Sequence, residues 1–146
     1  MNVFVIEPAK PGDPEVVEAI TRLLPLLSTS AASPTSSEID EIASSPATTL
    51  FLARDGEGGR IVGTLTLAMF RTPTGTRAWI EDVIVAEETR GRGCGEQLTV
   101  AALDAARAAG ARTVELTSRP SREAANRLYQ RLGFVLRETN LYRYQL

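Results

Sequence analysis

The sequence predicts a single α/β domain built on a mixed β-sheet that is antiparallel in its N-terminal part and contains one parallel pair further on. Apolar runs separated by glycine-rich turns indicate consecutive antiparallel strands over residues 48–85. The alanine-rich segment 93–109 has the spacing of a helix that crosses over to a parallel strand. With 146 residues, 43% of them hydrophobic, the chain is long enough for one core, so we expect one domain over 1–146.

The N-terminal third is predicted to form one strand and two helices. Residues 3–6 are an apolar run that ends before Pro8, which indicates a strand. Asp13 and Pro14 form a helix start, and Pro25 should end or kink that helix near Leu24. The Ser/Thr-rich stretch 28–37 predicts a mobile loop, either a connector or a lid over substrate, followed by a short helix over about 37–43.

The middle of the chain is predicted to form the sheet and its crossover. Strands over 48–54 and 60–70 are joined by a turn at 55–59, and a turn at 72–75 returns a third strand over 76–85. Gly110 is expected to end the helix 93–109. A strand over 113–117 then pairs in parallel with 76–85.

The C-terminal segment is predicted to contain a helix and two short strands. Ser121 is expected to cap the helix and Gly133 to end it. Residues 134–136 and 141–144 would complete the sheet as two short strands. The last of these strands would allow a homodimer, formed by pairing of this strand between two copies of the chain.

Composition excludes several classes of function. The net charge of −2 and the absence of a basic run argue against nucleic-acid binding. The chain has no His and one Cys, which leaves no basis for a zinc site, a His-based triad or an internal disulfide. The longest apolar run, 61–70, is too short to cross a membrane, and no leader precedes the first strand, so we expect a cytoplasmic protein without a membrane partner.

The segment Arg90-Gly91-Arg92-Gly93-Cys94-Gly95-Glu96 follows a strand and opens a helix. Glycines at alternate positions let backbone N–H groups converge, and a helix N-terminus adds unpaired donors and positive dipole, so the segment is suited to a pyrophosphate. A P-loop would need a Lys after a glycine, and a dinucleotide fingerprint would need a small residue in place of Glu96. Neither pattern matches.

Two motifs resemble those of the GCN5-related N-acetyltransferase (GNAT) superfamily. Arg-x-x-Gly-x-Gly, formed by Arg90, Gly93 and Gly95, resembles the coenzyme A loop of that superfamily. The run from Asn126 through Tyr129 to Phe134 resembles its Asn-x-x-Tyr helix leading into Leu-Gly-Phe. The expected order of strands and helices is also that of the superfamily, so the resemblance implies a GNAT-like acyl-CoA N-acyltransferase fold.

The resemblance implies that acetyl-CoA is the co-substrate and that no metal takes part. It places the pyrophosphate on the amides from Gly91 to Glu96, with Arg90 and Arg92 as supplementary charge. It places the pantetheine arm along Val83, Ile84 and Val85, where the strand diverges from 113–117 and a backbone N–H faces the thioester oxygen. Asn126 would contact the cofactor through its side-chain amide.

Glu81 is the candidate general base, because an ordinary amine has a pKa of about 10 and must lose a proton before it attacks. Trp79, Ile80 and Val83 would desolvate Glu81, although Glu81 or Asp82 can equally lie on a solvated face, and strand alternation lets only one of the two reach a given site. Tyr129 is the candidate acid for the leaving thiolate.

Other candidate residues keep a structural alternative. Tyr129 can instead be a packed helix aromatic, and Asn126 an exposed helix residue. The position of Cys94 at a helix N-terminus would lower its pKa, but no neighbouring His or Lys activates it, so we expect an incidental thiol.

The predicted function is transfer of the acetyl group of acetyl-CoA to a primary amine of a small molecule or peptide, by direct attack in a ternary complex. The alternative is a non-catalytic acyl-CoA-binding or sensor module, which would need neither Glu81 nor Tyr129. A nucleotide hydrolase is a third possibility, but the sequence lacks the Lys and the metal-binding signature of that class. Glu38, Asp40 and Glu41 are able to attract a cationic amine, or they form the solvated face of a short helix.

Overall fold

The computed structural model describes residues 3–146, which form two compact units. The first unit runs to Leu116, and the second spans Thr117–Leu146. The single domain expected over 1–146 stays a prediction.

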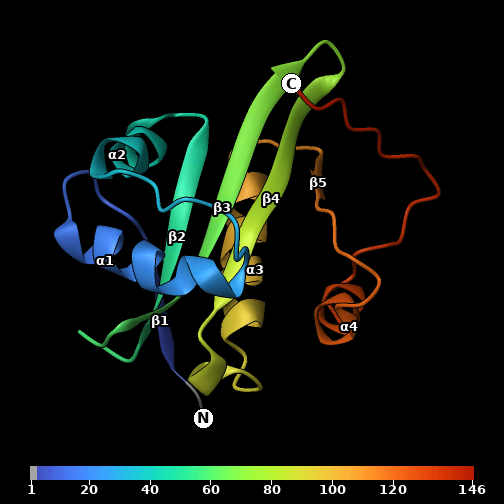
Figure 1. The fold of residues 1–146 in the computed structure, drawn as a ribbon. Coiled ribbons are helices and arrows are strands. Elements are labelled where there is room, and N and C mark those ends of the chain that lie inside the picture. The colour runs from blue at the N-terminus through green and yellow to red at the C-terminus, as the bar shows by residue number, and fades with distance from the viewer. Residues whose placement is uncertain (1–2) are drawn as a thin grey trace. The chain divides into compact units, whose positions relative to one another are not determined.

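The first unit contains a five-stranded sheet in the order β1-β2-β3-β4-β5 (Figure 1). Its elements are β1 (Phe4–Pro8), α1 (Pro14–Leu23), α2 (Ser36–Ser44), β2 (Thr48–Asp55), β3 (Ile61–Thr72), β4 (Gly75–Val85), α3 (Cys94–Ala108) and β5 (Thr113–Glu115). The pairs β1/β2, β2/β3 and β3/β4 are antiparallel, and β4/β5 is parallel. The mixed sheet and the parallel pair predicted from the sequence are therefore confirmed.

The helix ends follow the local signals in the sequence. The Asp13 side chain accepts a hydrogen bond from the Glu15 amide at 2.9 Å, and α1 begins at Pro14. The helix stops at Leu23 and passes into a 3-10 turn over Leu24–Leu26, as Pro25 predicts. At the C-terminus of α3, Gly110 has φ = 82°, the left-handed conformation expected after a helix end.

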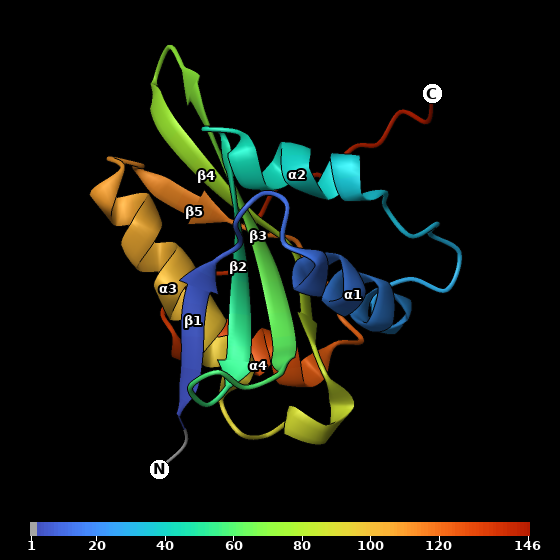
Figure 2. The same cartoon turned by 90° about the vertical axis from the view of Figure 1, so that its left-hand side faces the viewer.

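Helices cover both faces of the sheet. In Figures 1 and 2, α1 and α2 lie on one face and α3 lies on the other. The core on the α1/α2 face consists of Ala9, Val16, Ala19, Ile39, Leu50, Leu52 and Ile61. On the other face, α3 buries Cys94, Leu98, Ala102 and Ala106. Small side chains at three of these four positions let the α3 backbone come close to the sheet.

The second unit contains one helix, α4 (Glu123–Arg131). Its N-cap is Arg122 with no side-chain hydrogen bond, so the prediction that Ser121 caps the helix is wrong. The helix begins at Glu123, one residue later than a Ser121 cap would give, and its first intrahelical bond runs from the Asn126 amide to the Arg122 carbonyl at 3.0 Å. Gly133 has φ = 103° and ends the helix as predicted.

The two C-terminal strands predicted over 134–136 and 141–144 are absent from the structure. Val135, Leu136, Leu141, Tyr142 and Tyr144 are all exposed. A strand needs a partner for its backbone N–H and C=O groups, and within this unit the only regular element is a helix, which offers none. Strand β5 is also shorter than predicted, ending at Glu115 instead of residue 117.

Candidate functional site

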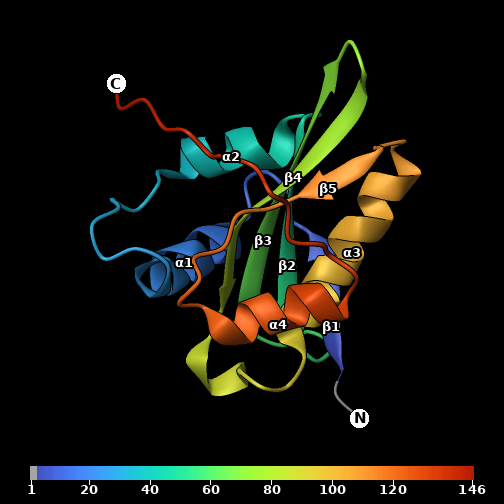
Figure 3. The same cartoon turned by 90° about the vertical axis from the view of Figure 1, so that its right-hand side faces the viewer.

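Strand β4 has a long edge that β5 does not cover. The parallel pairing consists of Arg77↔Thr113, Ala78↔Val114 and Trp79↔Glu115, and it ends there, whereas β4 continues to Val85 (Figure 3). On its other side β4 stays paired with β3 as far as Val85. Over 80–85, backbone groups that point toward the β5 side have no strand partner within residues 3–116, so this edge is able to accept an extended ligand.

A β-bulge interrupts β4 at Asp82. Glu81 pairs with Thr66 and Ile84 with Thr64, so two residues of β4 face one residue of β3 at this point. Asp82 has φ = 50°, a left-handed conformation that Asp tolerates better than most residues. The bulge breaks the strand alternation, and Glu81 and Asp82 are both exposed. Exposure of both carboxylates does not test the expectation that only one of the two reaches a given site, and that expectation stays a prediction.

Glu81 is not enclosed by the apolar residues near it in sequence. Ile80 is buried, Trp79 and Val83 are half-buried, and the Glu81 side chain is exposed. The desolvation expected from Trp79, Ile80 and Val83 is therefore absent from this structure. As a candidate base, Glu81 would act from a solvated position, directly or through water.

The glycine loop, residues 90–96 between β4 and α3, leads into a helix N-terminus whose first amides have no intrahelical acceptor. Gly91 and Gly93 have φ = 78° and 87°, and Gly93 is the N-cap of α3. The first bond of the helix runs from the Gln97 amide to the Gly93 carbonyl at 3.0 Å. The Cys94 and Gly95 amides precede that bond and have no intrahelical acceptor, which is the arrangement that binds phosphate groups.

Arg92 is turned toward the sheet. Its amide donates to the Thr89 carbonyl at 3.3 Å, so this amide of the predicted set is used within the loop. Its guanidinium lies 2.9 Å and 3.2 Å from the two carboxylate oxygens of Asp55 and 5.1 Å from the ring centre of Phe4. The hydrogen bond from Arg92 lowers the pKa of Asp55. Arg90 is exposed.

Cys94 is buried at the first position of α3. Burial raises the pKa of its thiol to about 12, and nearby Asp55 adds to the rise while Arg92 opposes it. The lowering of the Cys94 pKa expected from the helix N-terminus is therefore wrong, because desolvation of the buried thiolate is the largest effect on this thiol. A thiol in this state is not a nucleophile at neutral pH.

Two of the three acids considered for attracting an amine have structural partners. The Glu38 carboxylate accepts a hydrogen bond from the Thr35 amide at 3.0 Å in a capping box, which lowers the pKa of Glu38. Asp40 accepts from the Gly12 amide at 2.7 Å. The third acid, Glu41, is exposed.

Asn126 and Tyr129 lie three residues apart on α4, a spacing that places both on one side of the helix. The Asn126 amide nitrogen Nδ2 donates to the Arg119 carbonyl at 3.0 Å, which fixes the chain before the helix. The Tyr129 ring packs edge-on against Phe134, with centroids 5.7 Å apart. Burial raises the pKa of Tyr129, partly offset by Arg122, so its hydroxyl stays protonated at neutral pH.

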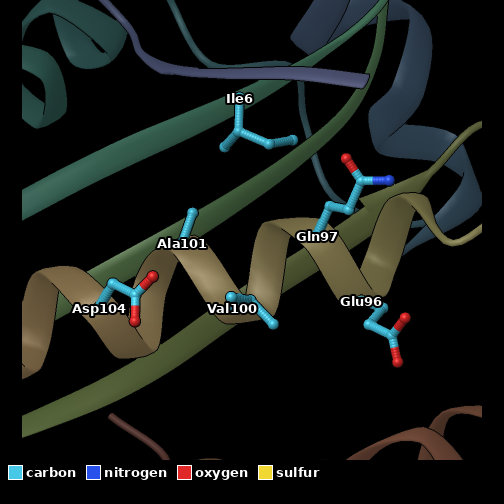
Figure 4. A pocket seen from close by; sticks show the side chains of 6 residues that line it. All are labelled: Ile6, Glu96, Gln97, Val100, Ala101 and Asp104. Atoms are coloured by element: carbon cyan, nitrogen blue, oxygen red, sulfur yellow. The ribbon is translucent and has the colours of Figure 1, made fainter. Parts of the chain in front are cut away.

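A hollow of about 350 Å³ lies between β1 and α3 (Figure 4). It is lined by Ile6, Glu96, Gln97, Val100, Ala101 and Asp104. Ile6 points from β1 toward α3. Of the predicted site residues only Glu96 lines this hollow, so it is separate from the exposed edge of β4.

Within residues 3–146, no helix is long and apolar enough to cross a membrane. The same part of the chain contains no group of three His, Cys, Asp or Glu side chains placed to hold a metal ion.

Comparison with known proteins identifies the family. The model of the acetyltransferase (GNAT) family matches residues 17–134, so the chain belongs to this family of acetyltransferases. The match includes the whole loop, the bulged strand and α4.

Individual relatives agree with this membership. The chain is 40% identical over 73 residues to N-alpha-acetyltransferase 30 of Schizosaccharomyces pombe, a match covering 50% of this chain and 48% of that protein. It is 35% identical over 88 residues to N-alpha-acetyltransferase MAK3 of Arabidopsis thaliana, covering 60% and 46%. The chain thus spans about half the length of the curated relatives it matches.

A solved structure shows the same fold across nearly the whole chain. It is the aminoglycoside acetyltransferase meta-AAC0020 from an uncultured soil metagenomic sample, in complex with sisomicin, with a TM-score of 0.84 and 18% identity. The match covers 98% of this chain and 95% of that one.

Proposed function

We propose that the protein transfers the acetyl group of acetyl-CoA to a primary amine of a small molecule or peptide, by direct attack in a ternary complex. One observation supports this most strongly. The uncovered edge of β4 leads directly into the glycine loop, whose first-turn amides at Cys94 and Gly95 have no intrahelical acceptor. An extended arm along the strand and a diphosphate on the loop are the two parts of coenzyme A that this arrangement fits.

Each predicted residue has a chemical task in this proposal. Amides from Gly91 to Glu96, except that of Arg92, would hold the pyrophosphate, and Arg90 would add exposed positive charge. A backbone N–H of Val83, Ile84 or Val85 would polarise the thioester carbonyl. Asn126 would contact the co-substrate through its side-chain oxygen Oδ1, because Nδ2 donates to Arg119.

Glu81 would take a proton from the acceptor ammonium, directly or through one water. Its exposure allows contact with an acceptor arriving from solvent. Tyr129 would give a proton to the leaving thiolate. Because burial raises the pKa of Tyr129, its hydroxyl is protonated at neutral pH.

The acceptor proposal covers two kinds of amine. The two curated relatives are N-alpha-acetyltransferases by name, which supports a peptide N-terminus. The metagenomic structure is an aminoglycoside acetyltransferase in complex with sisomicin, which supports a small-molecule amine. The predicted homodimer, the cytoplasmic location and the exclusion of nucleic-acid and membrane partners stay predictions.

The test is an acceptor screen that follows free-thiol release from acetyl-CoA, with peptides and aminoglycosides in separate panels. We expect amine-dependent thiol release by the wild-type protein that is strongly reduced in Glu81→Gln. Tight acetyl-CoA binding without thiol release across both panels would instead favour the non-catalytic acyl-CoA-binding module.

A further inference from the structure

We propose that Gly63 and Cys94 are positioning residues that together set the height of the glycine loop above β3. This inference rests on the proposed function, because it concerns how the loop is held to bind a diphosphate. Gly63 is the third residue of β3, and Cys94 is the first residue of α3. Neither residue contributes a side chain to catalysis.

The contact between them leaves no room for another atom. A Cβ at Gly63 would lie 2.9 Å from the Cys94 sulfur, 3.1 Å from Leu98 Cδ1 and 3.3 Å from the Ile84 carbonyl oxygen. Real Cβ atoms essentially never approach another heavy atom within 3.0 Å, so a methyl group here forces a neighbouring group to shift. The nearest atom belongs to the short Cys94 side chain, so we expect the first turn of α3 to move. The absence of a side chain at Gly63 therefore brings the helix N-terminus down onto the sheet.

The same part of β3 also holds the start of the loop. The Ala86 amide donates to the Val62 carbonyl at 2.8 Å, one residue from Gly63. The buried Thr89 hydroxyl then donates to the Ala86 carbonyl at 2.9 Å, which closes the turn before Arg90. Thus β3 fixes the start of this segment through the Ala86–Val62 hydrogen bond and its end through the contact with the Cys94 side chain.

The consequence for binding is geometric. The Cys94 and Gly95 amides belong to the turn that rests on Gly63, so a shift of that turn moves these donors relative to the β4 edge. A ligand that spans both the edge and the loop tolerates little change in their separation, since hydrogen bonds weaken steeply outside about 2.7–3.2 Å. The loss should therefore appear in co-substrate affinity.

The experiment compares four proteins: the wild type, Gly63→Ala, Cys94→Ala and the double variant. Coenzyme A affinity is measured by calorimetry, and kcat and KM for acetyl-CoA are measured in the thiol-release assay. We expect Gly63→Ala to weaken coenzyme A binding about 10-fold, with a matching rise in KM and a smaller change in kcat, as a shift of about 1.4 kcal/mol would give.

The double variant is the decisive arm. Removing the Cys94 sulfur vacates the space that the added methyl needs, and Leu98 can change rotamer to accommodate the rest. We expect the double variant to bind coenzyme A within about threefold of Cys94→Ala. Cys94→Val, which enlarges the other partner of the contact, should weaken binding in the same direction as Gly63→Ala.

Stability loss alone is controlled with Ile39→Val, which trims a buried side chain on the opposite face of the sheet and should leave affinity unchanged. If Gly63→Ala lowers Tm but leaves affinity unchanged, or if the double variant binds as weakly as Gly63→Ala, the inference is wrong. If the wild type fails to bind coenzyme A, the proposed function fails instead, and the two results are distinguishable.

Discussion

The glycine loop and the β-bulge at Asp82 lie close together in the chain but differ in how the surrounding structure contacts them. The loop is attached to the sheet through the buried Cys94, through the Arg92–Asp55 ion pair and through the hydrogen bond from the Ala86 amide to the Val62 carbonyl. At the bulge, Glu81 and Asp82 are both exposed. Packing therefore fixes the part proposed to bind, and solvent surrounds the part proposed to react.

Because of this difference, co-substrate affinity and the rate of the chemical step should respond separately to mutation. Changes in the loop move backbone donors and should alter co-substrate affinity. Changes at the bulge remove one functional group from an otherwise unchanged strand and should alter the chemical step.

The largest effect is expected at Glu81. Glu81→Gln keeps the shape of the side chain but removes the proton acceptor, so kcat should fall about 10²- to 10⁴-fold, with coenzyme A affinity unchanged. Steady-state kinetics and calorimetry measure the two quantities. Asp82→Asn is the matched control, because it alters a neighbouring exposed carboxylate, and its kcat should change far less. Unchanged turnover in Glu81→Gln would remove Glu81 from the mechanism.

Tyr129→Phe should lower kcat about 100-fold, because the leaving thiolate loses its proton donor. The phenyl ring retains the edge-on contact with Phe134, so the fold should be preserved. A thioester with a more acidic thiol needs less protonation, and the defect should shrink with such a donor. A defect of the same size with both donors would mean that Tyr129 has only a packing role.

A smaller effect is expected at Arg92. Its guanidinium is bonded to Asp55 and both side chains are largely exposed, so Arg92→Met should weaken coenzyme A binding by no more than about fivefold. Arg90→Met provides the comparison, since Arg90 is exposed on the same loop. A far larger loss for Arg92 than for Arg90 would show that Arg92 contacts the phosphates after all.

The smallest effect concerns the pH dependence of stability. The pKa of Cys94 in the folded chain is about 12, against an ordinary value of 9.0, so the unfolded thiol ionises first as pH rises. This contribution to stability is complete below pH 9 and is lost between pH 9 and 12. Urea unfolding at pH 8 and pH 10 should therefore show a steeper loss for the wild type than for Cys94→Ala. Parallel losses would contradict the burial of the thiol.

Much of the first unit could be predicted from the sequence because local signals and packing agree there. Asp13, Pro14 and Pro25 act within one turn of the helix, and Gly110 ends α3 where the apolar spacing ends. The order and direction of β2, β3 and β4 follow from two glycine-containing turns.

What sequence reasoning missed depends on contacts distant in the chain. The strands predicted over 134–136 and 141–144 have the right residues, but a strand forms only against a partner. The bulge at Asp82 comes from a register shift against β3, which no local pattern reveals. A faint signal was available in the Asp itself, because Asp tolerates positive φ.

The sequence predicted an incidental thiol at Cys94, and the packing role proposed for it needed the structure. Cys94 lies against Gly63, which is 31 positions earlier in the sequence, and only the fold brings the two together. The pairing of Arg92 with Asp55 is hidden in the sequence for the same reason.

Binding of a diphosphate by the loop amides is tested most directly by comparing a ligand that contains a diphosphate with one that does not. Affinities for acetyl-CoA and for acetyl-pantetheine, which lacks the diphosphate, are measured with the wild type, Gly93→Ala and Gly110→Ala. Both glycines have φ above 80°, so alanine costs about 1–2 kcal/mol of backbone strain at either end of α3. We expect Gly93→Ala to weaken acetyl-CoA binding about 10-fold and to leave acetyl-pantetheine binding unchanged, while Gly110→Ala affects the binding of neither ligand. Equal weakening of both ligands by Gly93→Ala would contradict this expectation.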